Sequence, residues 1–357
     1  MYYSTSKAGS YTGVVKFWQS IQGDGNPHKL KYKDIKEWLA RQYTYSIHKH
    51  PIEKFKREPI IVGEINEIID SDLMDMQKFS KKNNGIRFLA IFIDLFSRYL
   101  RVQPMKTKKG VEMAQVLEKV FNDIEPSVRS IRTDQGSEYK AKVVQEYFKS
   151  KNINHIITYN VYHANYAERV IRTLKGRIYR FFTKHQSHRY IDDLQDIVRG
   201  YNNTRHSSIG MSPAQVTLEN QQELYEKLYL PVELKREQTT VVFRYEIGDK
   251  VRIPFSRRPF QRGFDQKWTE EIFLIDKRIS SHPPRYRLVD LQLDTIGGSF
   301  YEQELQEANV DDDEVYKVEK ILRHRIKDGE RQGLVSWLGY PAKFNSWVDI
   351  DQIHNYE

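Results

Sequence analysis

One stretch of the sequence, Ile86 to Phe96 (IRFLAIFIDLF), is almost continuously apolar and limits the possible folds more than any other. A run of this length and composition predicts a strand that is buried on both faces, in the centre of a sheet. We therefore expect the middle of the chain to be a domain built around a sheet that contains residues 86–96.

The neighbouring segments predict the order of elements in that sheet. Residues 60–76 and 99–104 have the pattern of extended strands, with a hairpin turn of the Asn-Gly kind at 81–85. Helix and strand patterns then alternate, and a long helix is expected from Asn165 to His185, followed by two further helices around 191–201 and 213–220. Three antiparallel strands followed by alternating helices and strands is the order of a ribonuclease-H-like sheet.

Whole-chain properties limit the function. The 357 residues leave room for two to four domains. A net charge of +9 and a pI of about 9.2 favour a polyanionic partner, with nucleic acid as the first candidate. The absence of cysteine excludes disulfides, thiolate nucleophiles and zinc sites that need Cys. No apolar run is long enough to span a membrane, so a soluble chain with no membrane partner is expected.

The segment Ser130 to Tyr139 (SIRTDQGSEY) begins with the alternation of a strand and ends in a polar turn that carries Asp134 at its first corner. A carboxylate at the carboxyl end of a strand, before a Gly-containing turn, is well placed for metal chemistry in an open α/β sheet. The same residue can instead cap the helix that follows. This segment alone leaves both interpretations open.

The predicted helix at 165–185 carries an acidic residue at its beginning and a basic stripe behind it. At 100° per residue, Glu168, Arg172 and Lys175 fall within roughly 60° of one another, away from the apolar face. These residues can form a functional surface, or a solvated face with an i,i+4 pair between Glu168 and Arg172.

Three acidic motifs together resemble those of retroviral-type integrases. Asp72 lies in SDLMDM, Asp134 in TDQGSE and Glu168 in AERVIRTLK, and the separation 168 − 134 = 34 is close to the usual spacing of that family. The run YNNTRHSSIGMSP at 201–213 resembles the segment that closes the integrase core. The resemblance covers about residues 60–220.

This resemblance implies a polynucleotidyl transferase with Asp72, Asp134 and Glu168 as catalytic metal ligands. Phosphoryl transfer on this fold uses two Mg²⁺ ions about 3.5–4 Å apart, for which Mn²⁺ can substitute, and hard cations take oxygen ligands. With these roles, Asp134 is expected to be a ligand rather than a cap. Asp70 and Asp75 are alternatives to Asp72, and Asp70 would share its face of the strand.

The resemblance also implies DNA contacts. Arg172 and Lys175 match positions at which such integrases contact the ends of the donor DNA. Residues 240–308 resemble the SH3-like β-barrel that binds DNA in the same group, and a basic segment inside it is either a set of phosphate contacts or a solvated loop. The contacts expected there are Arg257, Arg258 and Arg262.

The N-terminal module indicates which group of integrases the chain resembles. Residues 1–58 are similar to the N-terminal helical module of Polinton/Maverick transposon integrases, a group shared with some virophages. Retroviral integrases bind zinc in this part of the chain through two His and two Cys. Because this chain has no Cys, His28, His48 and His50 are expected to be ordinary surface or turn residues.

Residues 314–357 resemble a chromodomain. Tyr316, Trp337 and Tyr340 match its methyl-lysine cage, and all three are aromatic, as binding of a quaternary ammonium by cation–π interaction requires. Trp347 is expected in the core of this module. A purely structural aromatic cluster is the alternative interpretation.

The expected fold is therefore multidomain α/β: a helical module (1–58), a ribonuclease-H-like core (59–232), an SH3-like barrel (240–308) and a chromodomain (314–357). The expected function is metal-dependent 3′-end processing and strand transfer of mobile-element or viral DNA into host chromatin. The implied partners are element-end DNA, target DNA, a methylated histone tail on a nucleosome and further copies of the chain, in the nucleus. The alternatives are a catalytically inactive, host-adopted chromatin-binding protein and a ribonuclease-H-type nuclease.

Overall fold

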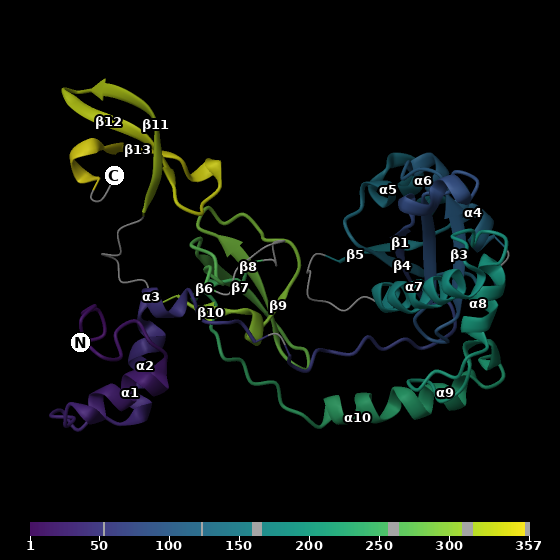
Figure 1. Cartoon of the computed structure of the whole chain (residues 1–357), viewed down its shortest axis with the longest axis horizontal. Helices are drawn as coiled ribbons and strands as arrows, with labels where there is room; N and C mark the ends of the chain where they lie inside the picture. Colours follow the sequence, from purple (N-terminus) through teal and green to yellow (C-terminus); the bar gives the residue numbers. More distant parts are fainter. Residues whose placement is uncertain (53, 123, 159–165, 256–263, 309–316, 354–357) are drawn as a thin grey trace. The chain divides into compact units, whose positions relative to one another are not determined.

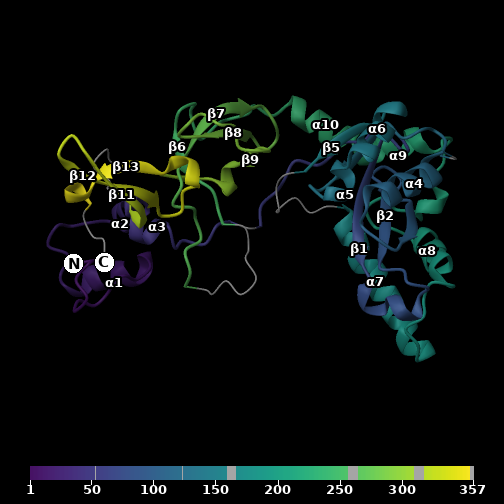
Figure 2. The same ribbon diagram turned by 90° about the horizontal axis from the view of Figure 1, so that it is seen from above.

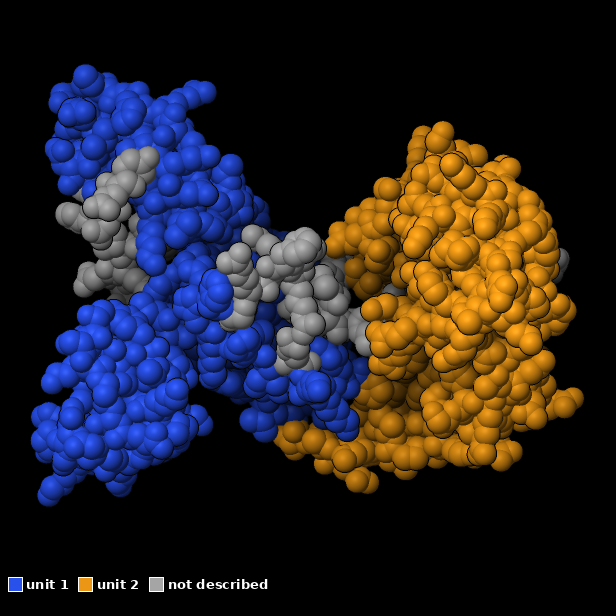
Figure 3. Space-filling model, in the orientation of Figure 1, with its two compact units in different colours: residues 1–58, 241–357 blue, residues 59–240 orange. Residues whose placement is uncertain are grey.

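The structure, a computed structural model, is shown as a ribbon in Figure 1. It describes residues 1–52, 54–122, 124–158, 166–255, 264–308 and 317–353. The chain divides into two compact units, residues 59–240 and residues 1–58 together with 241–357 (Figure 3). Within the described residues, no helix has both the length and the apolar character needed to cross a membrane.

The unit of residues 59–240 is built on a five-stranded sheet with the order β3–β2–β1–β4–β5. Its strands are β1 (Ile68–Asp75), β2 (Phe88–Asp94), β3 (Leu100–Met105), β4 (Ser130–Thr133) and β5 (Asn154–Ile157). β1, β2 and β3 pair antiparallel, whereas β4 pairs parallel with both β1 and β5. The predicted order of three antiparallel strands followed by two strands separated by helices is confirmed.

Helices cover both faces of this sheet (Figures 1 and 2). One face packs against α4 (Gly110–Phe121) and α6 (Lys142–Ser150), which follows the short α5 (Ser137–Lys140). The other face packs against α7 (Tyr166–His185) and α8 (Leu194–Asn202). We call these the α4 face and the α7 face.

The two covered faces explain the apolar run. All seven residues of β2 are buried, and the six apolar ones alternate between two hydrophobic cores. Leu89, Ile91 and Ile93 point to the α7 face, while Phe88 and Phe92 belong to the α4 face. The predicted burial is confirmed, but β1 rather than β2 occupies the centre of the sheet, because β4 adds on the far side of β1.

Three local predictions were wrong. Residues 60–67 are not part of the first strand, which begins at Ile68. The connection from β1 to β2 is not a tight hairpin, since the 3₁₀ helix η1 (Gln77–Lys82) comes before the turn. The helix expected at 213–220 is reduced to η2 (Pro213–Gln215) and is followed by α9 (Gln221–Leu228) and α10 (Leu230–Glu237).

The second unit contains three small modules. The first is helical, with α1 (Val14–Gly23), α2 (Tyr32–Arg41) and α3 (Tyr43–Ser46). The second is a five-stranded antiparallel sheet with the order β10–β6–β7–β8–β9. Its elements are β6 (Lys250–Arg252), β7 (Phe273–Ile279), β8 (Arg285–Asp290), β9 (Phe300–Tyr301), η3 (Glu302–Glu304) and β10 (Gln306–Glu307). The third is the sheet β11 (Val318–Lys327), β12 (Glu330–Trp337) and β13 (Ser346–Asp349), with η4 (Ala342–Phe344) and η5 (Ile350–Gln352).

The end of the helical module is bonded to the five-stranded sheet. The backbone N–H groups of Lys267 and Trp268 both donate to the carbonyl of Ile47, at 2.9 and 3.3 Å. The indole Nε1 of Trp268 donates to the carbonyl of Lys49 at 2.6 Å. The segment after α3 therefore packs as part of the sheet module.

Candidate active site

The register of the central sheet brings two of the predicted catalytic residues side by side. Asp70 on β1 is paired with Arg132 on β4 in a parallel ladder. Asp72 lies two positions after Asp70, and Asp134 lies two positions after Arg132. Because side chains alternate along a strand, Asp72 shares the face of Met74, which belongs to the core beneath α7. Asp72 therefore lies on the α7 face of β1, within electrostatic reach of Asp134, which directly follows the end of β4.

Their electrostatics agree with this placement. The pKa of Asp72 is raised to about 6, mainly by burial and in part by the negative charge of Asp134, while the N–H of Leu73, which donates to Asp72 Oδ1 at 2.7 Å, opposes this increase. Asp134 is exposed, and its Oδ1 accepts from the N–H of Gly136 at 2.9 Å. The N-cap position of α5 is Gly136 itself, without a side-chain bond, so Asp134 does not cap that helix.

A second carboxylate beside Asp134 was not predicted. Glu138 is only 7% exposed. A Cβ atom added at Gly136 would lie 2.8 Å from Glu138 Oε1 and 3.0 Å from Asp134 Oδ1, so both oxygens approach the same point of the backbone. Glycine at 136 permits this approach. The motif TDQGSE contained the signal for it, namely an acid two residues beyond the glycine.

The third predicted catalytic residue, Glu168, lies in the first turn of α7. The N–H of the preceding residue, Ala167, donates to Asp70 Oδ2 at 3.1 Å, which holds the backbone of this turn against β1. The side chain of Glu168 is 63% exposed, and its Oε1 lies 4.0 Å from Arg172 Nη2. In the described parts of the chain, no three His or acidic side chains converge as a metal site would require. The structure thus places Asp72 within electrostatic reach of Asp134, and it holds the first turn of α7, which carries Glu168, against Asp70 of β1.

The two alternatives to Asp72 have other partners. Asp70 is fully buried and accepts two bonds from the Arg132 guanidinium, at 2.9 and 3.0 Å. Asp75 is exposed and accepts from the backbone N–H and side chain of Gln77 at 2.9 and 3.0 Å. Asp72 is therefore the acid of β1 that is available to act beside Asp134.

A hydrogen-bonded network that sequence reasoning did not predict holds the end of β4. Gln145 Nε2 donates to the carbonyl of Tyr139 at 2.6 Å and to His155 Nδ1 at 2.9 Å. The proton of the ring is therefore assigned to Nε2, which lies 2.9 Å from Thr133 Oγ1. The Thr133 hydroxyl in turn donates to the carbonyl of Asp134 at 2.7 Å. Burial lowers the pKa of His155, which favours the neutral ring that this network needs.

The predicted DNA contacts are only partly described. On α7, Arg172 is exposed and Lys175 is half-buried, one turn apart on the surface that also carries Glu168. The other predicted contacts lie outside the described residues: Arg257, Arg258 and Arg262.

The predicted methyl-lysine cage is also partly described, because Tyr316 lies outside the described residues. Trp337 ends β12 and donates from Nε1 to Ser346 Oγ at 3.0 Å. Tyr340 follows in the next turn and makes an edge contact with Phe344, at 5.5 Å between ring centroids. Trp347, expected in the core, is half-buried with the Arg325 guanidinium 4.1 Å from its ring centroid.

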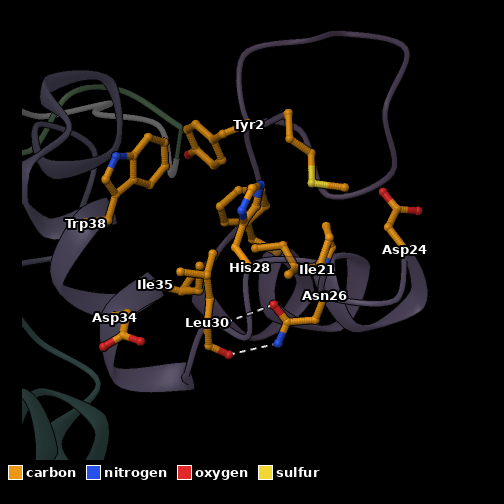
Figure 4. Close-up of a pocket in the computed structure, with 12 residues that line it drawn as sticks. Tyr2, Ile21, Asp24, Asn26, His28, Leu30, Asp34, Ile35 and Trp38 are labelled. Atoms are coloured by element: carbon orange, nitrogen blue, oxygen red, sulfur yellow. Dashed lines mark hydrogen bonds between the residues drawn. The ribbon is translucent and has the colours of Figure 1, made fainter.

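An apolar cavity of about 610 Å³ lies in the helical module and does not include the acidic residues of the sheet (Figure 4). Tyr2, Ile21, Ile35 and Trp38 contribute much of its apolar wall. One of its edges is shaped by the Asn26 side chain, which bonds both the N–H and the carbonyl of Leu30 at 2.9 Å. Asp24, His28 and Asp34 also line the cavity, which contains none of the three predicted catalytic acids.

Comparisons with known proteins agree with the geometry of the sheet. Residues 66–188 match the model of the integrase core domain, and residues 316–357 match the model of the chromodomain. The chain therefore contains a segment similar to the integrase core domain and, after it, a segment similar to the chromodomain.

Two individual proteins are similar over longer stretches. An uncharacterized transposon-derived protein of Caenorhabditis elegans is 33% identical over 199 residues, which is 56% of this chain and 66%, just under two thirds, of that protein. A chain from the simian T-cell lymphotropic virus intasome, solved by cryo-electron microscopy in complex with PP2A regulatory subunit B56 gamma, is 15% identical with a TM-score of 0.56. That similarity covers 84% of this chain and 99% of the viral chain, and at this identity it shows the fold alone.

Proposed function

We propose that this chain, with its integrase core domain and chromodomain, is a DNA integrase that inserts mobile-element or viral DNA into host chromatin. The observation that carries the proposal is that Asp72 on β1 lies close enough to Asp134, directly after the end of β4, to be affected by its charge, while α7 carries Glu168 in its first turn. In 3′-end processing, the oxygen of a water molecule attacks a phosphorus near the DNA end and the bond to the 3′-oxygen breaks. In strand transfer, the freed 3′-hydroxyl attacks a target phosphorus and displaces the target 3′-oxygen.

Integrase core domains normally use a divalent metal, and the donor set here fits one. Asp72, Asp134 and Glu168 offer only carboxylate oxygens, which Mg²⁺ and Mn²⁺ prefer. Asp72 is half-buried beside the charge of Asp134, an arrangement that a cation would stabilise. Two Mg²⁺ ions held by these residues would stabilise charge on the attacking and leaving oxygens. The exposed side chain of Glu168 would reach them by leaving Arg172, an ion pair of small energy at an exposed position.

We infer that the basic surface of α7 binds the phosphates of the element's DNA ends. Changing Arg172 and Lys175 together to Gln should lower the slope of log K against log salt concentration by about 2, since each phosphate contact contributes roughly 0.9. Fluorescence anisotropy of a labelled duplex, measured between about 50 and about 300 mM salt, gives this slope and checks the expectation.

The matched control for that measurement is Lys142→Gln. Lys142 begins α6, a helix of the α4 face, and its side chain is 91% exposed. This variant should lower the affinity less than the α7 variants. Equal slopes for the wild type and the double variant would contradict the assignment of Arg172 and Lys175.

The remaining assignments extend the same proposal. Tyr316, Trp337 and Tyr340 would hold a methylated lysine of a histone tail, which would bring the enzyme to nucleosomes in the nucleus. The five-stranded sheet module of residues 241–308 would act as the SH3-like DNA-binding barrel, with Arg257, Arg258 and Arg262 on phosphates. We further propose membership of the Polinton/Maverick group and assembly of several copies, since two DNA ends must be joined at one target.

One observation favours the second candidate, a catalytically inactive chromatin-binding protein. The carboxylate of Glu168 forms an ion pair with Arg172, so it is not positioned to share a metal ion with the two aspartates. In such a protein the Glu168–Arg172 pair would be permanent, and the fold would serve only to hold DNA.

A strand-transfer assay separates the candidates. The full chain is incubated with Mg²⁺, a labelled duplex carrying the element's end, and a target plasmid. Joined product supports the integrase. Binding of DNA and of a trimethyl-lysine peptide without joined product supports the inactive chromatin-binding protein, and cleavage confined to RNA–DNA hybrids supports a nuclease.

A further inference from the structure

Asp70 is a buried carboxylate whose oxygens are all engaged by groups from other elements. Its Oδ1 accepts from Arg132 Nε at 2.9 Å, and its Oδ2 accepts from Arg132 Nη2 at 3.0 Å. Oδ2 also accepts from the backbone N–H of Ala167 at 3.1 Å. Asp70 is fully buried and the Arg132 side chain is 11% exposed, so water screens this ion pair very little. We call these three groups the Asp70 clasp.

The first connection of the clasp joins the two strands that carry the aspartates. Asp70 and Arg132 are directly paired residues of the β1–β4 ladder, and each lies two positions before a predicted ligand. A two-pronged guanidinium–carboxylate contact has a defined geometry, unlike a contact with a single lysine. The clasp therefore holds β1 and β4 in register immediately below Asp72 and Asp134.

The second connection joins β1 to the beginning of α7. Ala167 is the second residue of the helix, where backbone N–H groups have no acceptor within the helix. Asp70 supplies an acceptor from strand β1, and its negative charge suits the positive end of the helix dipole. The neighbouring residue Tyr166 is held from a further side by Arg98, which is 7% exposed and lies 4.2 Å from the centroid of its ring.

We propose that the Asp70 clasp is a positioning device for the metal ligands. It sets the separation of Asp72 and Asp134 through the strands, and it sets the place of Glu168 through the first turn of α7. Asp70 and Arg132 are positioning residues in this account, because their charged groups are buried against each other and Arg132 occupies the carboxylate that would otherwise be a competing ligand. The inference rests on the proposed metal-dependent integrase function.

The test uses the full-length chain and the variants Asp70→Asn, Arg132→Gln, Arg132→Lys and the charge-balanced double variant Asp70→Asn/Arg132→Gln. Substituting a group that orients metal ligands typically lowers metal affinity or activity by about 10–100-fold. We expect Asp70→Asn, Arg132→Gln and the double variant to weaken Mn²⁺ binding by that factor in calorimetry. The Mn²⁺ concentration needed for half-maximal strand transfer should rise by the same factor. The KM for the DNA end should stay within about twofold, since the phosphate contacts are untouched. Arg132→Lys should recover part of the loss.

A second readout follows the helix directly. Amide hydrogen exchange in the peptide that begins at Tyr166 should be about tenfold faster in Asp70→Asn, because a cap of the first turn is weakened. Matched controls are Asp75→Asn on the same strand and Arg129→Gln just before β4, whose side chain is 68% exposed and pairs only with Glu64 in the described structure. Both controls should behave as the wild type in Mn²⁺ affinity and in exchange.

The outcomes separate the clasp from the proposed function. If the wild type binds Mn²⁺ and joins DNA while the clasp variants match the controls, the positioning role of the clasp is wrong, and the proposed integrase function is retained. If the variants only melt earlier, with unchanged Mn²⁺ affinity in the folded protein, the clasp is merely structural and the proposal is overturned. If the wild type binds Mn²⁺ but joins no DNA, the integrase function fails, and the Mn²⁺ affinities and exchange rates still decide whether the clasp positions the ligands.

Discussion

Asp134→Asn is expected to lower Mg²⁺-dependent strand transfer by about 10³-fold or more, which corresponds to about 4 kcal/mol of lost transition-state stabilisation. The substitution keeps the size of the side chain but removes the charge that would hold the metal beside Asp72. Affinity for the DNA end should change by less than about threefold, because Asp134 is not among the basic phosphate contacts. Single-turnover joining of a labelled duplex measures the rate, and anisotropy measures the affinity.

The control for this substitution is Asp75→Asn, which removes an exposed acid of β1 that bonds only Gln77 in the described structure. That variant should join DNA at the wild-type rate. An Asp134→Asn protein that retained a tenth of the wild-type rate would remove Asp134 from the catalytic set.

The second large effect concerns Asp94, a buried acid at the end of β2. Its carboxylate accepts from the backbone N–H groups of Asn66, Phe96 and Ser97 at 3.1, 3.2 and 2.9 Å, and from the Ser97 hydroxyl at 2.5 Å. Asp94→Ala leaves these donors without their acceptor in the interior. Each such group costs about 1–3 kcal/mol, so the unit of residues 59–240 should lose about 4 kcal/mol of unfolding free energy.

The stability of this unit can be measured separately from that of the other unit. All five tryptophans lie outside residues 59–240, so tryptophan fluorescence reports the other unit. Amide exchange of β2 should become about 10³-fold faster in Asp94→Ala, which is the equivalent of about 4 kcal/mol. The tryptophan unfolding transition should stay unchanged, and Asp75→Ala should change neither signal. Unaltered exchange in β2 would show that Asp94 is not a structural acceptor.

The parts of the fold that sequence reasoning predicted are those with strong periodicity. The run at 86–96 predicted a strand buried on both faces, and the apolar stripe at 165–185 predicted α7 almost to the residue. Both signals come from hydrophobic burial, which depends on the order of residue types along the chain. The positions of Asp72, Asp134 and Glu168 on a strand, at a strand end and at a helix start were predictable for the same reason.

The unpredicted features depend on contacts between distant residues. Nothing in the local sequence shows that Arg132 pairs with Asp70, since the contact exists only when β4 adds to β1 in one register. The network of His155 and Gln145 likewise requires β5 and α6 to meet beside Thr133. The turn before β2 was misjudged because Asn-Gly marks a turn without revealing the 3₁₀ helix that precedes it.

The exposed side chain of Glu168 has the least determined role of the three acids. In the structure it pairs with Arg172, the i,i+4 alternative that the sequence also allowed. A surface pair of this kind contributes about 0.3–0.5 kcal/mol, much less than binding to a divalent cation would. We therefore expect Glu168 to change partner when metal is present.

Anomalous diffraction from crystals of the full chain grown with Mn²⁺ measures that change directly. We expect manganese density at the α7 face, with carboxylate oxygens of Asp72, Asp134 and Glu168 all about 2.1 Å from a metal ion and Glu168 turned away from Arg172. Manganese bound without Glu168, which would then still be paired with Arg172, or no manganese at this face at all, would contradict the account.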